Sequence, residues 1–552
     1  MEDVRQAIAA AVRATWDAEV DPIVSRPDSQ FGDFATNVAM QLAKQLGKSP
    51  RDIAEALAAA LAGHGYEATV AGPGFINIRL GDDKLAQLVQ AADTIPQTWQ
   101  GKVVVAEYSD PNPFKVLHAG HLYTSIVGDA VANVFEAAGA DVHRVNFGGD
   151  VGLHVGKTMW ALLGELGGEH PEKLSALAAD KRSEWMAAAY IKGTAAYEDN
   201  ESAKQEIVAL NKRVYALHAQ NDHESPFAQI YWTCRQWSYD YFDAFYARIG
   251  TRFERYYPES TVADLGLATV KEQLDKGVFT ESNGAVVFEG EQFGLHTRVF
   301  INGEGLPTYE AKDVGLIMHK KADYNFDTSL VITGNEQEQY MAVVLKAVEQ
   351  FAPELSHATK HLTHGIVKLT GGVKMSSRKG NILRAVDVLD TAAAANKEAT
   401  GKDDESVVLG AVKYSFLKPR IGGDIMYDPA ESVSIEGNSG PYLQYAHARA
   451  CSIMNKAGHV GDLPSQFTEF ERLLALKISE FPEVMQKVLH EFMPHHICTY
   501  LYELTQTFNR FYENERVVGD EREAQRLALL SAYRQILKRG LGLLGIAAPE
   551  SM

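Results

Sequence analysis

The chain has few cysteines, no long apolar run and no excess of positive charge, and each absence excludes a class of protein. Its 552 residues include only Cys234, Cys451 and Cys498. Three cysteines far apart argue against a disulfide framework and against a zinc site. No apolar run approaches the roughly 20 residues that span a bilayer. The acidic start, Met1–Arg5, lacks the apolar core of a secretory signal. We therefore expect a protein of the reducing cytoplasm.

The charge balance favours acidic residues. Lys and Arg number 53 against 72 Asp and Glu, which gives a formal net charge of −19. Non-specific binding to nucleic acids depends on neutralising phosphates, so this balance counts against it. It leaves open the recognition of RNA by local basic patches and by shape. Charge alone therefore does not indicate an RNA partner.

Length and hydrophobic patterning predict an α/β multidomain protein of about 3–4 domains. We expect a small α+β domain over residues 1–98, built from helical stripes and an alternating strand. Over 99–404, strands alternate with helices, which implies a Rossmann-type parallel sheet, with a charged helical insertion at about 157–220. Residues 405–552 have helical apolar spacing almost throughout, which predicts an all-α bundle.

The first informative motif is His-Ala-Gly-His at 118–121, which lies between a β-branched run and a helical stretch at 122–138. A helix N-terminus offers free N–H groups and the positive end of its dipole, which together bind phosphate. Gly120 lets a ligand approach the backbone, and His118 and His121 share a helix face. Taken alone, the motif is more simply a helix start with two solvated histidines.

The second motif places two cations and two hydroxyls on a loop between glycines. Its residues are Lys374, Met375, Ser376, Ser377 and Arg378. Taken alone, it is more simply a surface loop. In this order and in these contexts, the two motifs resemble the paired ATP-binding signatures of class I aminoacyl-tRNA synthetases. The resemblance implies ATP as a substrate, with Mg²⁺ carried by its phosphates and water, and no structural metal or protein metal cage.

Polar residues near the expected strand ends narrow the resemblance. Glu107 and Asn112 precede the histidines, Tyr309 and Asp313 are four apart at a helix start, and Gln337 follows an apolar strand. These spacings, the segment 440–449 and the ending 543–552 are similar to arginyl-tRNA synthetases over essentially the whole chain. The family implies an arginine–tRNA ligase, which activates L-arginine to arginyl-adenylate and transfers it to the 2′-hydroxyl of the terminal adenosine of tRNA-Arg.

The same resemblance implies roles for the candidate residues. Asn112 and Gln337 would hold the amino and carboxylate end of arginine, while Glu107, Tyr309 and Asp313 would line its amino and guanidinium groups. A guanidinium is a planar fork of five donors, so its site needs carboxylates and an aromatic or amide wall. Contacts to ATP would come from His118, Gly120, His121, Lys374, Met375 and Ser377. Charge stabilisation in catalysis would come from His118, His121, Lys374, Ser376, Ser377 and Arg378.

Four positions depart from the common family pattern. Val151 and His154 stand in a segment where many relatives carry Gly-Asp-Trp-Gly-x-Gln. Lys312 replaces the usual Arg before the Asp, and Tyr340 replaces the His that often follows the Gln. These changes affect the expected shape of the pocket and leave its charged and amide positions intact.

Two regions resemble the tRNA-contacting parts of the family. The segments 32–37 and 72–77 are similar to the N-terminal domain, and 509–516 to the anticodon domain. Candidate tRNA contacts are Phe34, Asn37, Tyr442, Gln444, Arg449, Phe511 and Tyr512. Aromatic residues at helical spacing usually belong to the core, so we expect only one or two of the C-terminal ones to touch RNA. We expect a monomer.

Three alternatives stay open at this point. A nucleotidyltransferase of the same superfamily would form an adenylate without tRNA, but rarely carries two flanking RNA domains. A catalytically silent relative would bind RNA, but the intact motifs speak against decay. A synthetase for another amino acid would fit less well, because the carboxylates favour a cationic substrate and neither a zinc-binding cluster nor an editing-sized insertion is present.

Overall fold

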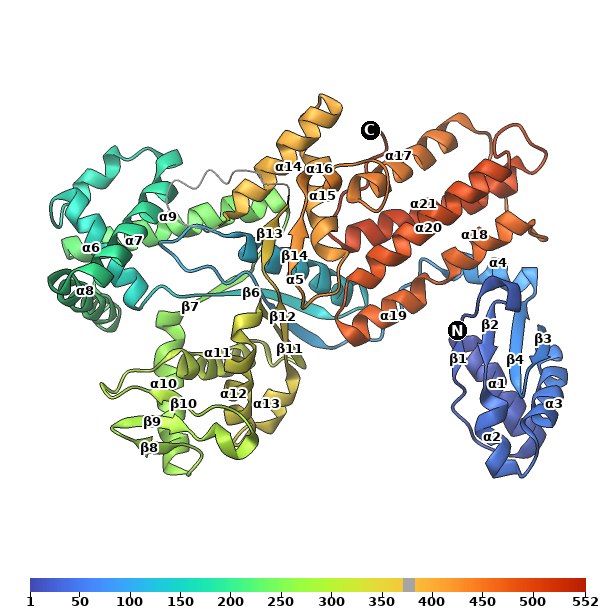
Figure 1. Cartoon of the computed structure of the whole chain (residues 1–552), viewed down its shortest axis with the longest axis horizontal. Coiled ribbons are helices and arrows are strands. Elements are labelled where there is room, and N and C mark those ends of the chain that lie inside the picture. The colour runs from blue at the N-terminus through green and yellow to red at the C-terminus, as the bar shows by residue number, and fades with distance from the viewer. Residues whose placement is uncertain (371–382) are drawn as a thin grey trace.

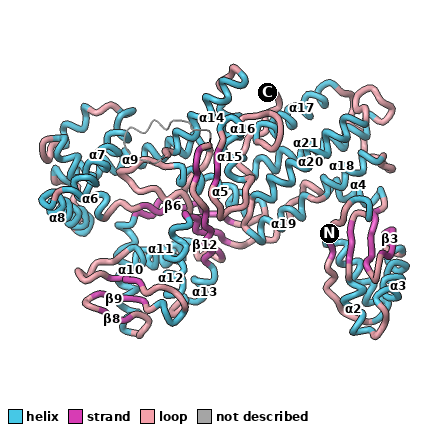
Figure 2. Tube along the Cα trace, in the orientation of Figure 1, coloured by secondary structure: helices cyan, strands magenta, loops and turns pink. Residues whose placement is uncertain are grey.

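The computed structural model describes residues 1–370 and 383–552. Three parts lie along the longest axis of the molecule, with the C-terminal helices between the central sheet and the N-terminal domain (Figure 1). A parallel sheet lies in the middle, helices α6–α8 project from one side of it, and the C-terminal helices on the other side carry the N-terminal domain. Strands gather in the central sheet, in the N-terminal domain and in a small sheet near α10 (Figure 2). The predicted fold class is confirmed.

The N-terminal domain is an antiparallel sheet of order β1-β2-β4-β3 covered by helices. Helix α1 forms because Val4, Ile8 and Val12 recur every four residues and all three are buried. Helix α3 begins where Ser49 accepts a hydrogen bond from Asp52 N, directly before Pro50. The elements are α1 (Glu2–Trp16), β1 (Val24–Ser25), β2 (Phe34–Thr36), α2 (Val38–Leu46), α3 (Pro50–Ala62), β3 (Tyr66–Ala71), β4 (Phe75–Leu80) and α4 (Asp82–Ala91).

The central sheet has five parallel strands in the order β12-β11-β5-β6-β7. Its middle strand is the β-branched run, whose residues from Val104 to Glu107 are buried, as expected for a strand with helices on both faces. Helix α5 follows that strand and is buried along most of its length. The strands are β5 (Val103–Glu107), β6 (Asp141–Gly148), β7 (Arg255–Pro258), β11 (Thr328–Gly334) and β12 (Thr359–His364), and α5 is Ala119–Ala137.

Two of the connections between strands of this sheet are long. Between β6 and β7 the chain forms α6 (Leu153–Leu166), α7 (Arg182–Asp199), α8 (Glu201–Ala219) and α9 (Pro226–Ile249). Between β7 and β11 it forms α10 (Glu259–Asp275), a three-stranded sheet of β8 (Thr280–Ser282), β9 (Ala285–Phe288) and β10 (Arg298–Ile301), and then α11 (Tyr309–Tyr324). Helices α10 and α11 pack closely, because Gly266 and Gly315 lie at their contact and carry no side chain. A Cβ at either position would collide with the backbone of the other helix.

The rest of the chain is mostly helical. After β11 come α12 (Glu338–Glu349), α13 (Pro353–Ala358), β13 (Val367–Leu369), α14 (Ala385–Thr400), α15 (Glu405–Leu417), β14 (Ile425–Tyr427) and α16 (Pro429–Ser432). The C-terminal helices are α17 (Gly440–Lys456), α18 (Glu469–Ser479), α19 (Phe481–Glu491), α20 (His495–Asn514) and α21 (Glu523–Leu543). The short strand β14 pairs in parallel with β13, although we expected helices almost throughout this region.

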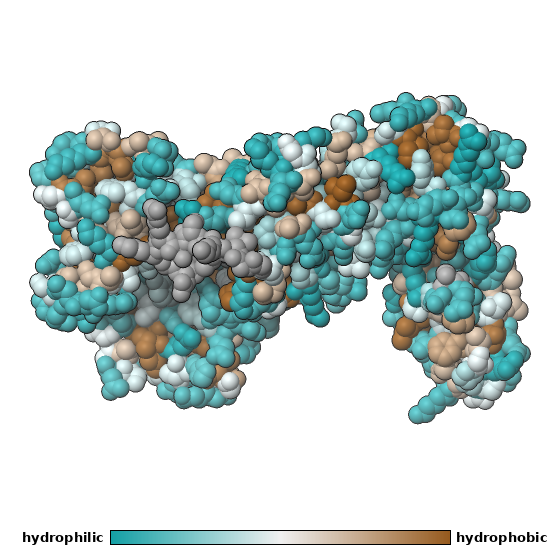
Figure 3. Space-filling model, turned by 45° about the horizontal axis from the view of Figure 1, so that its top comes forward, coloured by the Kyte–Doolittle hydropathy of each residue, from teal (hydrophilic) through white to brown (hydrophobic). Residues whose placement is uncertain are grey.

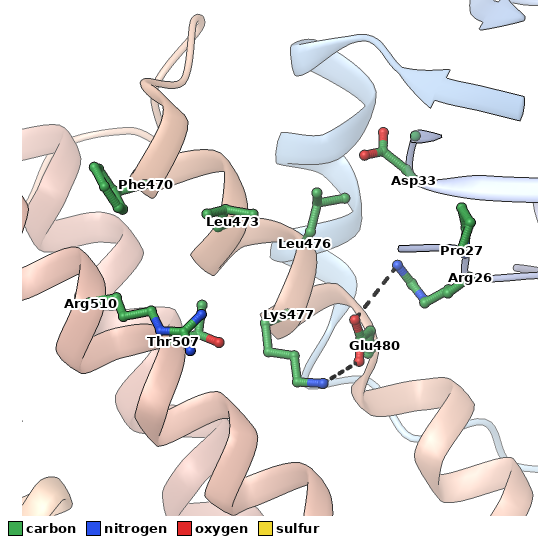
Figure 4. A pocket seen from close by; sticks show the side chains of 11 residues that line it. Arg26, Pro27, Asp33, Phe470, Leu473, Leu476, Lys477, Glu480, Thr507 and Arg510 are labelled. Carbon is green, nitrogen blue, oxygen red and sulfur yellow. Dashed lines mark hydrogen bonds and ion pairs between the residues drawn. The ribbon is translucent and has the colours of Figure 1, made fainter. Parts of the chain in front are cut away.

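Ion pairs hold the N-terminal domain against α18 and α19. Arg472 on α18 donates to Asp33 and Asp82, both at 2.6 Å, and also to Leu80 O at 2.9 Å. Arg26 donates to Glu483 at 3.0 Å. A cavity of about 190 Å³ lies along this seam (Figure 4). Its charged side chains pair with one another or with neighbours, except for the exposed Arg510, so we interpret it as a domain boundary and not as a substrate site.

The surface facing the viewer in Figure 3 is predominantly hydrophilic. Among the described residues, no helix combines the length and the apolarity that crossing a membrane would need. Cys234, Cys451 and Cys498 are buried and form no disulfide. Each therefore behaves as a small apolar core residue.

Candidate active site

A cavity of about 1040 Å³ opens at the carboxyl ends of β5 and β11. Ligands bind at this edge in open parallel sheets. The cavity brings together both motif histidines and all five residues predicted to contact arginine. These are His118, Gly120, His121, Glu107, Asn112, Tyr309, Asp313 and Gln337. Three segments of the chain, around residues 107–121, 309–313 and 337, therefore converge on one space.

The two histidines cap the start of α5. His118 is the N-cap residue, and its Nδ1 accepts from Gly120 N at 3.1 Å. His121 Nδ1 accepts from His118 N at 3.0 Å, and the ring centroids are 3.7 Å apart. Because each Nδ1 is an acceptor, the proton of each neutral ring sits on Nε2. Both Nε2–H groups are thus available as donors to a ligand in the cavity.

The environment keeps these histidines neutral. Burial lowers the pKa of His118, and lowers that of His121 well below its ordinary value. Lys115 and the other histidines nearby lower both values further. A neutral imidazole pair at a helix N-terminus offers directed hydrogen bonds to an anion.

Gly120 sits where a side chain would disturb this geometry. A Cβ at Gly120 would lie 2.8 Å from Cε1 and 2.9 Å from Nδ1 of His118. Both distances are shorter than ordinary contacts, so any larger residue would push the His118 ring away. The glycine is therefore required by the position of its neighbour.

Another part of the cavity lining is rich in carboxylates. Glu107 ends β5, and it is buried and bonded to Lys320 of α11. Asp313 accepts a hydrogen bond from Tyr340 OH, and burial raises its pKa to about 7. Burial and the charge of Glu107 also raise the pKa of Asp110 well above its ordinary value. These carboxylates form an acidic site suited to a cation.

The remaining candidates lie around these carboxylates. Asn112 Oδ1 accepts from Gly149 N at 2.7 Å, which turns its amide nitrogen toward other partners. Tyr309 starts α11 and is 55% exposed, so its ring forms an open wall of the cavity. Gln337 lies in a short 3-10 turn that follows β11 and is also exposed.

The residues that depart from the common family pattern have identifiable contacts in the structure. Lys312 Nζ donates to Glu259 at 2.7 Å, and both side chains are 5% exposed. His154 Nε2 lies 2.7 Å from Gly149 O, and burial lowers its pKa to about 3, so it stays neutral. Val151 is fully buried in the core of the α6–α9 insertion. Tyr340 is different, because its hydroxyl reaches into the acidic site.

Several cavity residues carried no signal in the sequence. These are Asp110, Glu259, Arg298, Glu336 and His364, together with Lys320 behind Glu107. Asp110 and the preceding Ser109 have φ values of 50° and 74°. Such strained backbone at a strand end is typical of functional sites, but a pattern of residue types does not reveal it.

The second motif, Lys374, Met375, Ser376, Ser377 and Arg378, lies outside the described residues. The residues on both sides of it lie at the cavity. Leu369 and Leu383 line the cavity wall. Leu383 O accepts from Ala119 N at 2.8 Å, next to the histidine turn.

The predicted tRNA contacts fall into a fully buried group and a half-buried group. Phe34, Gln444 and Phe511 are fully buried, so their side chains cannot reach RNA in this conformation. The Gln444 amide instead donates to Ser406 O and Ala547 O, which fixes the C-terminal tail against α15 and α17.

The other predicted tRNA contacts are half-buried. Asn37 is the N-cap residue of α2. Tyr442, Arg449 and Tyr512 lie together on α17 and α20, with the Arg449 guanidinium 4.6 Å from the Tyr512 ring centroid. Tyr445, which the sequence did not single out, is 44% exposed on the same helix as Tyr442.

Comparisons with known proteins agree along the whole chain. Family models match for the arginyl tRNA synthetase N terminal domain over residues 2–80, the catalytic domain of class I (R) tRNA synthetases over 84–421, and the DALR anticodon binding domain over 443–552. The arginine–tRNA ligase of Lactococcus lactis subsp. lactis is 30% identical, with 100% of this chain and 99% of that protein covered. That of Bdellovibrio bacteriovorus is 30% identical, with 96% and 94% covered.

A solved structure supports the same assignment. The arginyl-tRNA synthetase of Thermus thermophilus superposes with a TM-score of 0.81 at 26% identity, with 100% of both chains covered. The Plasmodium falciparum enzyme, at 22% identity and the same TM-score, agrees in fold. The chain belongs to the arginyl-tRNA synthetase family of class I aminoacyl-tRNA synthetases.

Proposed function

We propose that this chain is an arginine–tRNA ligase in which the cavity of about 1040 Å³ holds ATP at the histidine turn and L-arginine at the acidic end. The observation that carries this proposal is that two groups of residues converge on one cavity. A helix N-terminus with two free imidazole donors and a cluster of buried carboxylates open into the same space. Membership of the family supports the reaction, and the cavity supports the placement of its substrates.

The first step joins the two substrates. The α-carboxylate of arginine attacks the α-phosphorus of ATP, a P–O bond forms, the bond to the β-phosphate oxygen breaks, and pyrophosphate leaves. A carboxylate is already a nucleophile, so no general base is needed. Catalysis is then positioning together with stabilisation of phosphate charge, to which His118 and His121 contribute their Nε2–H groups. Lys374, Ser376, Ser377 and Arg378 are proposed partners in this step.

Mg²⁺ belongs to this proposal as the companion of ATP. It would be held mainly by phosphate oxygens and water. Within residues 1–370 and 383–552, no cluster of His, Cys, Asp and Glu side chains has the arrangement of a metal site.

The acidic end supplies the selection for arginine. Glu107 and Asp313 would accept the guanidinium donors, with Tyr309 as the aromatic wall. Asn112 and Gln337 would hold the α-amino and carboxylate end, nearer the histidines. A neutral side chain would leave buried carboxylates unpaired, which is why such a site rejects it strongly.

In the second step the 2′-hydroxyl of the terminal adenosine of tRNA-Arg takes the arginyl group, and AMP leaves. The molecule is concave between its N-terminal and catalytic parts (Figure 3), which suits a bent RNA partner. Tyr442, Arg449 and Tyr512 present aromatic and cationic groups for unpaired bases. We also propose residues 1–98, 99–404 and 405–552 as the tRNA-contacting, catalytic and anticodon-binding domains.

Three free, buried cysteines fit a reducing cytoplasm, which we propose as the place of action. We further propose that the chain works as a monomer.

The decisive test is ATP–pyrophosphate exchange with each of the twenty amino acids, with and without tRNA. We expect exchange with arginine alone. Exchange confined to reactions that contain tRNA would further show that activation is coupled to tRNA binding. Exchange with a different amino acid, or with none under either condition, would contradict the proposal.

A further inference from the structure

The buried ammonium group of Lys320 is paired with the Glu107 carboxylate. Its side chain is 1% exposed, and its ammonium group donates to Glu107 Oε2 and, at 3.0 Å, to Ser329 Oγ. Lys320 lies seven residues after Asp313 on α11, so both side chains project from the same helix face toward the sheet. Burying an ammonium group is costly unless it is paired, so its placement against Glu107 calls for an explanation.

Tyr340 donates a hydrogen bond to Asp313, as Lys320 does to Glu107. It lies in the first turn of α12, and its hydroxyl donates to Asp313 Oδ2. Its ring faces the Arg298 guanidinium, 5.4 Å from the centroid, which holds the ring in place. The family often carries His at this position, so the phenol donor is a feature of this chain.

The two contacts leave matching acceptors free. One oxygen of each carboxylate is engaged, and within the described part of the chain Glu107 Oε1 and Asp313 Oδ1 accept no hydrogen bond. A guanidinium needs such oxygens, held in fixed directions, to accept from its planar fork. Lys320 also offsets the charge of Glu107 where Asp110 and Asp313 approach it.

We propose that Lys320 and Tyr340 are positioning residues, which orient the Glu107 and Asp313 carboxylates so that each presents one oxygen to the guanidinium of L-arginine. This inference rests on the proposed placement of arginine. In this proposal neither residue holds the substrate itself, although Tyr340 lines the cavity. Both act by fixing the direction of the carboxylates that do, and the Tyr340 hydroxyl also favours the ionised form of Asp313.

The electrostatic surroundings of Asp313 support this role. Glu107, Asp110 and Glu259 face it and disfavour its charge, while Lys320 and the Tyr340 hydroxyl favour it. Removing the Tyr340 hydroxyl therefore raises the pKa of Asp313 further. Its ionised form, which the guanidinium requires, then becomes rarer near neutral pH.

The test compares Lys320→Met and Tyr340→Phe with the unmodified full-length chain, by arginine-dependent ATP–pyrophosphate exchange in the presence of tRNA. We expect each variant to raise the KM for arginine at least tenfold, the usual effect of losing a hydrogen bond to a charged group. The KM for ATP should stay within twofold. Matched controls are Lys321→Met, whose ammonium donates to Phe326 O away from the acidic site, and Tyr324→Phe at the far end of α11, and both should be neutral.

A second readout separates positioning from simple stabilisation. In Tyr340→Phe, the pH at which kcat/KM for arginine levels off should move upward, while the profile for ATP does not move. Tyr340→His restores a donor and should recover part of the arginine affinity. A purely structural role would change none of these.

The outcomes distinguish this inference from the proposed function. An unmodified chain that never exchanges with arginine would overturn both. An active chain whose variants keep the KM for arginine within twofold would overturn only the positioning role. Equal rises in both KM values would do the same, because they would indicate general damage. If Lys320→Met does not fold, Tyr340→Phe decides, since it removes a single oxygen atom.

Discussion

At the scale of single residues, the histidine turn works through tautomers. Both Nδ1 atoms accept backbone hydrogen bonds, so both Nε2–H groups point elsewhere. Burial lowers both pKa values, so neither ring relies on a positive charge. The pair therefore offers two oriented dipoles at a helix N-terminus, an arrangement suited to stabilising developing charge on phosphate.

Replacing His121 by Ala removes one of these donors. We expect the rate of arginine activation to fall about a hundredfold, which corresponds to ~3 kcal/mol of transition-state stabilisation. The melting temperature should change little. Single-turnover adenylate formation measures the effect, and a near-normal rate would remove His121 from the mechanism.

The raised pKa of Asp313 predicts that kcat/KM for arginine depends on pH and that kcat/KM for ATP does not. Its pKa is raised to about 7, so below pH 7 the empty site holds a protonated acid. Arginine stays cationic and requires the ionised form, so its binding releases a proton. We expect kcat/KM for arginine to rise about tenfold per pH unit up to about pH 7 and then level off.

Exchange assays from pH 5.5 to 8.5 check this, with kcat/KM for ATP as the internal comparison. The Asp313→Asn variant should be weak in arginine binding and flat with pH. A flat profile in the unmodified chain would show that Asp313 does not contact the guanidinium.

At the scale of elements, the turn between β5 and α5 depends on one small residue. The start of α5 is fixed by its histidine caps, and Gly120 fits beneath the His118 ring. A methyl group at this position would be 2.8 Å from that ring. The strand-to-helix turn and the phosphate site are therefore the same piece of structure.

Gly120→Ala should accordingly lower the activation rate at least tenfold, even though Ala favours helices by about 1 kcal/mol over Gly. Gly164→Ala on α6 is the matched control, because a Cβ there meets nothing within 4 Å. That change should leave the rate unaltered and raise the melting temperature slightly. Similar rates in the two variants would refute the steric argument.

At the scale of the whole molecule, the N-terminal domain is tied to the helical domain by buried ion pairs. Arg472 joins Asp33 and Asp82 across this boundary, and its side chain is 9% exposed. Asp33 belongs to the segment that resembles a tRNA-contacting motif, so here its carboxylate serves the contact between domains. The position of the N-terminal domain relative to the catalytic cavity is thereby held in place.

Arg472→Met should loosen this contact, since removing one partner of a buried pair costs about 3–5 kcal/mol. We expect faster proteolysis between residues 92 and 98 and a higher KM for tRNA, with the KM values for arginine and ATP unchanged. Arg13→Met is the control, because its pair with Glu19 is 63% and 77% exposed and contributes little. If Arg472→Met keeps the normal KM for tRNA, the contact does not serve RNA binding.

The sequence by itself determined the elements and the chemistry of the turn. Apolar periodicity, the cap residues and the histidine motif act within a few positions of one another, so they can be predicted from sequence. The tertiary structure decided which polar groups meet. Lys320 and Glu107 are 213 positions apart, and only the order of the parallel strands brings them together. It also placed Phe34, Gln444 and Phe511 in the core, because neither strand alternation nor helical spacing says by itself which face is buried.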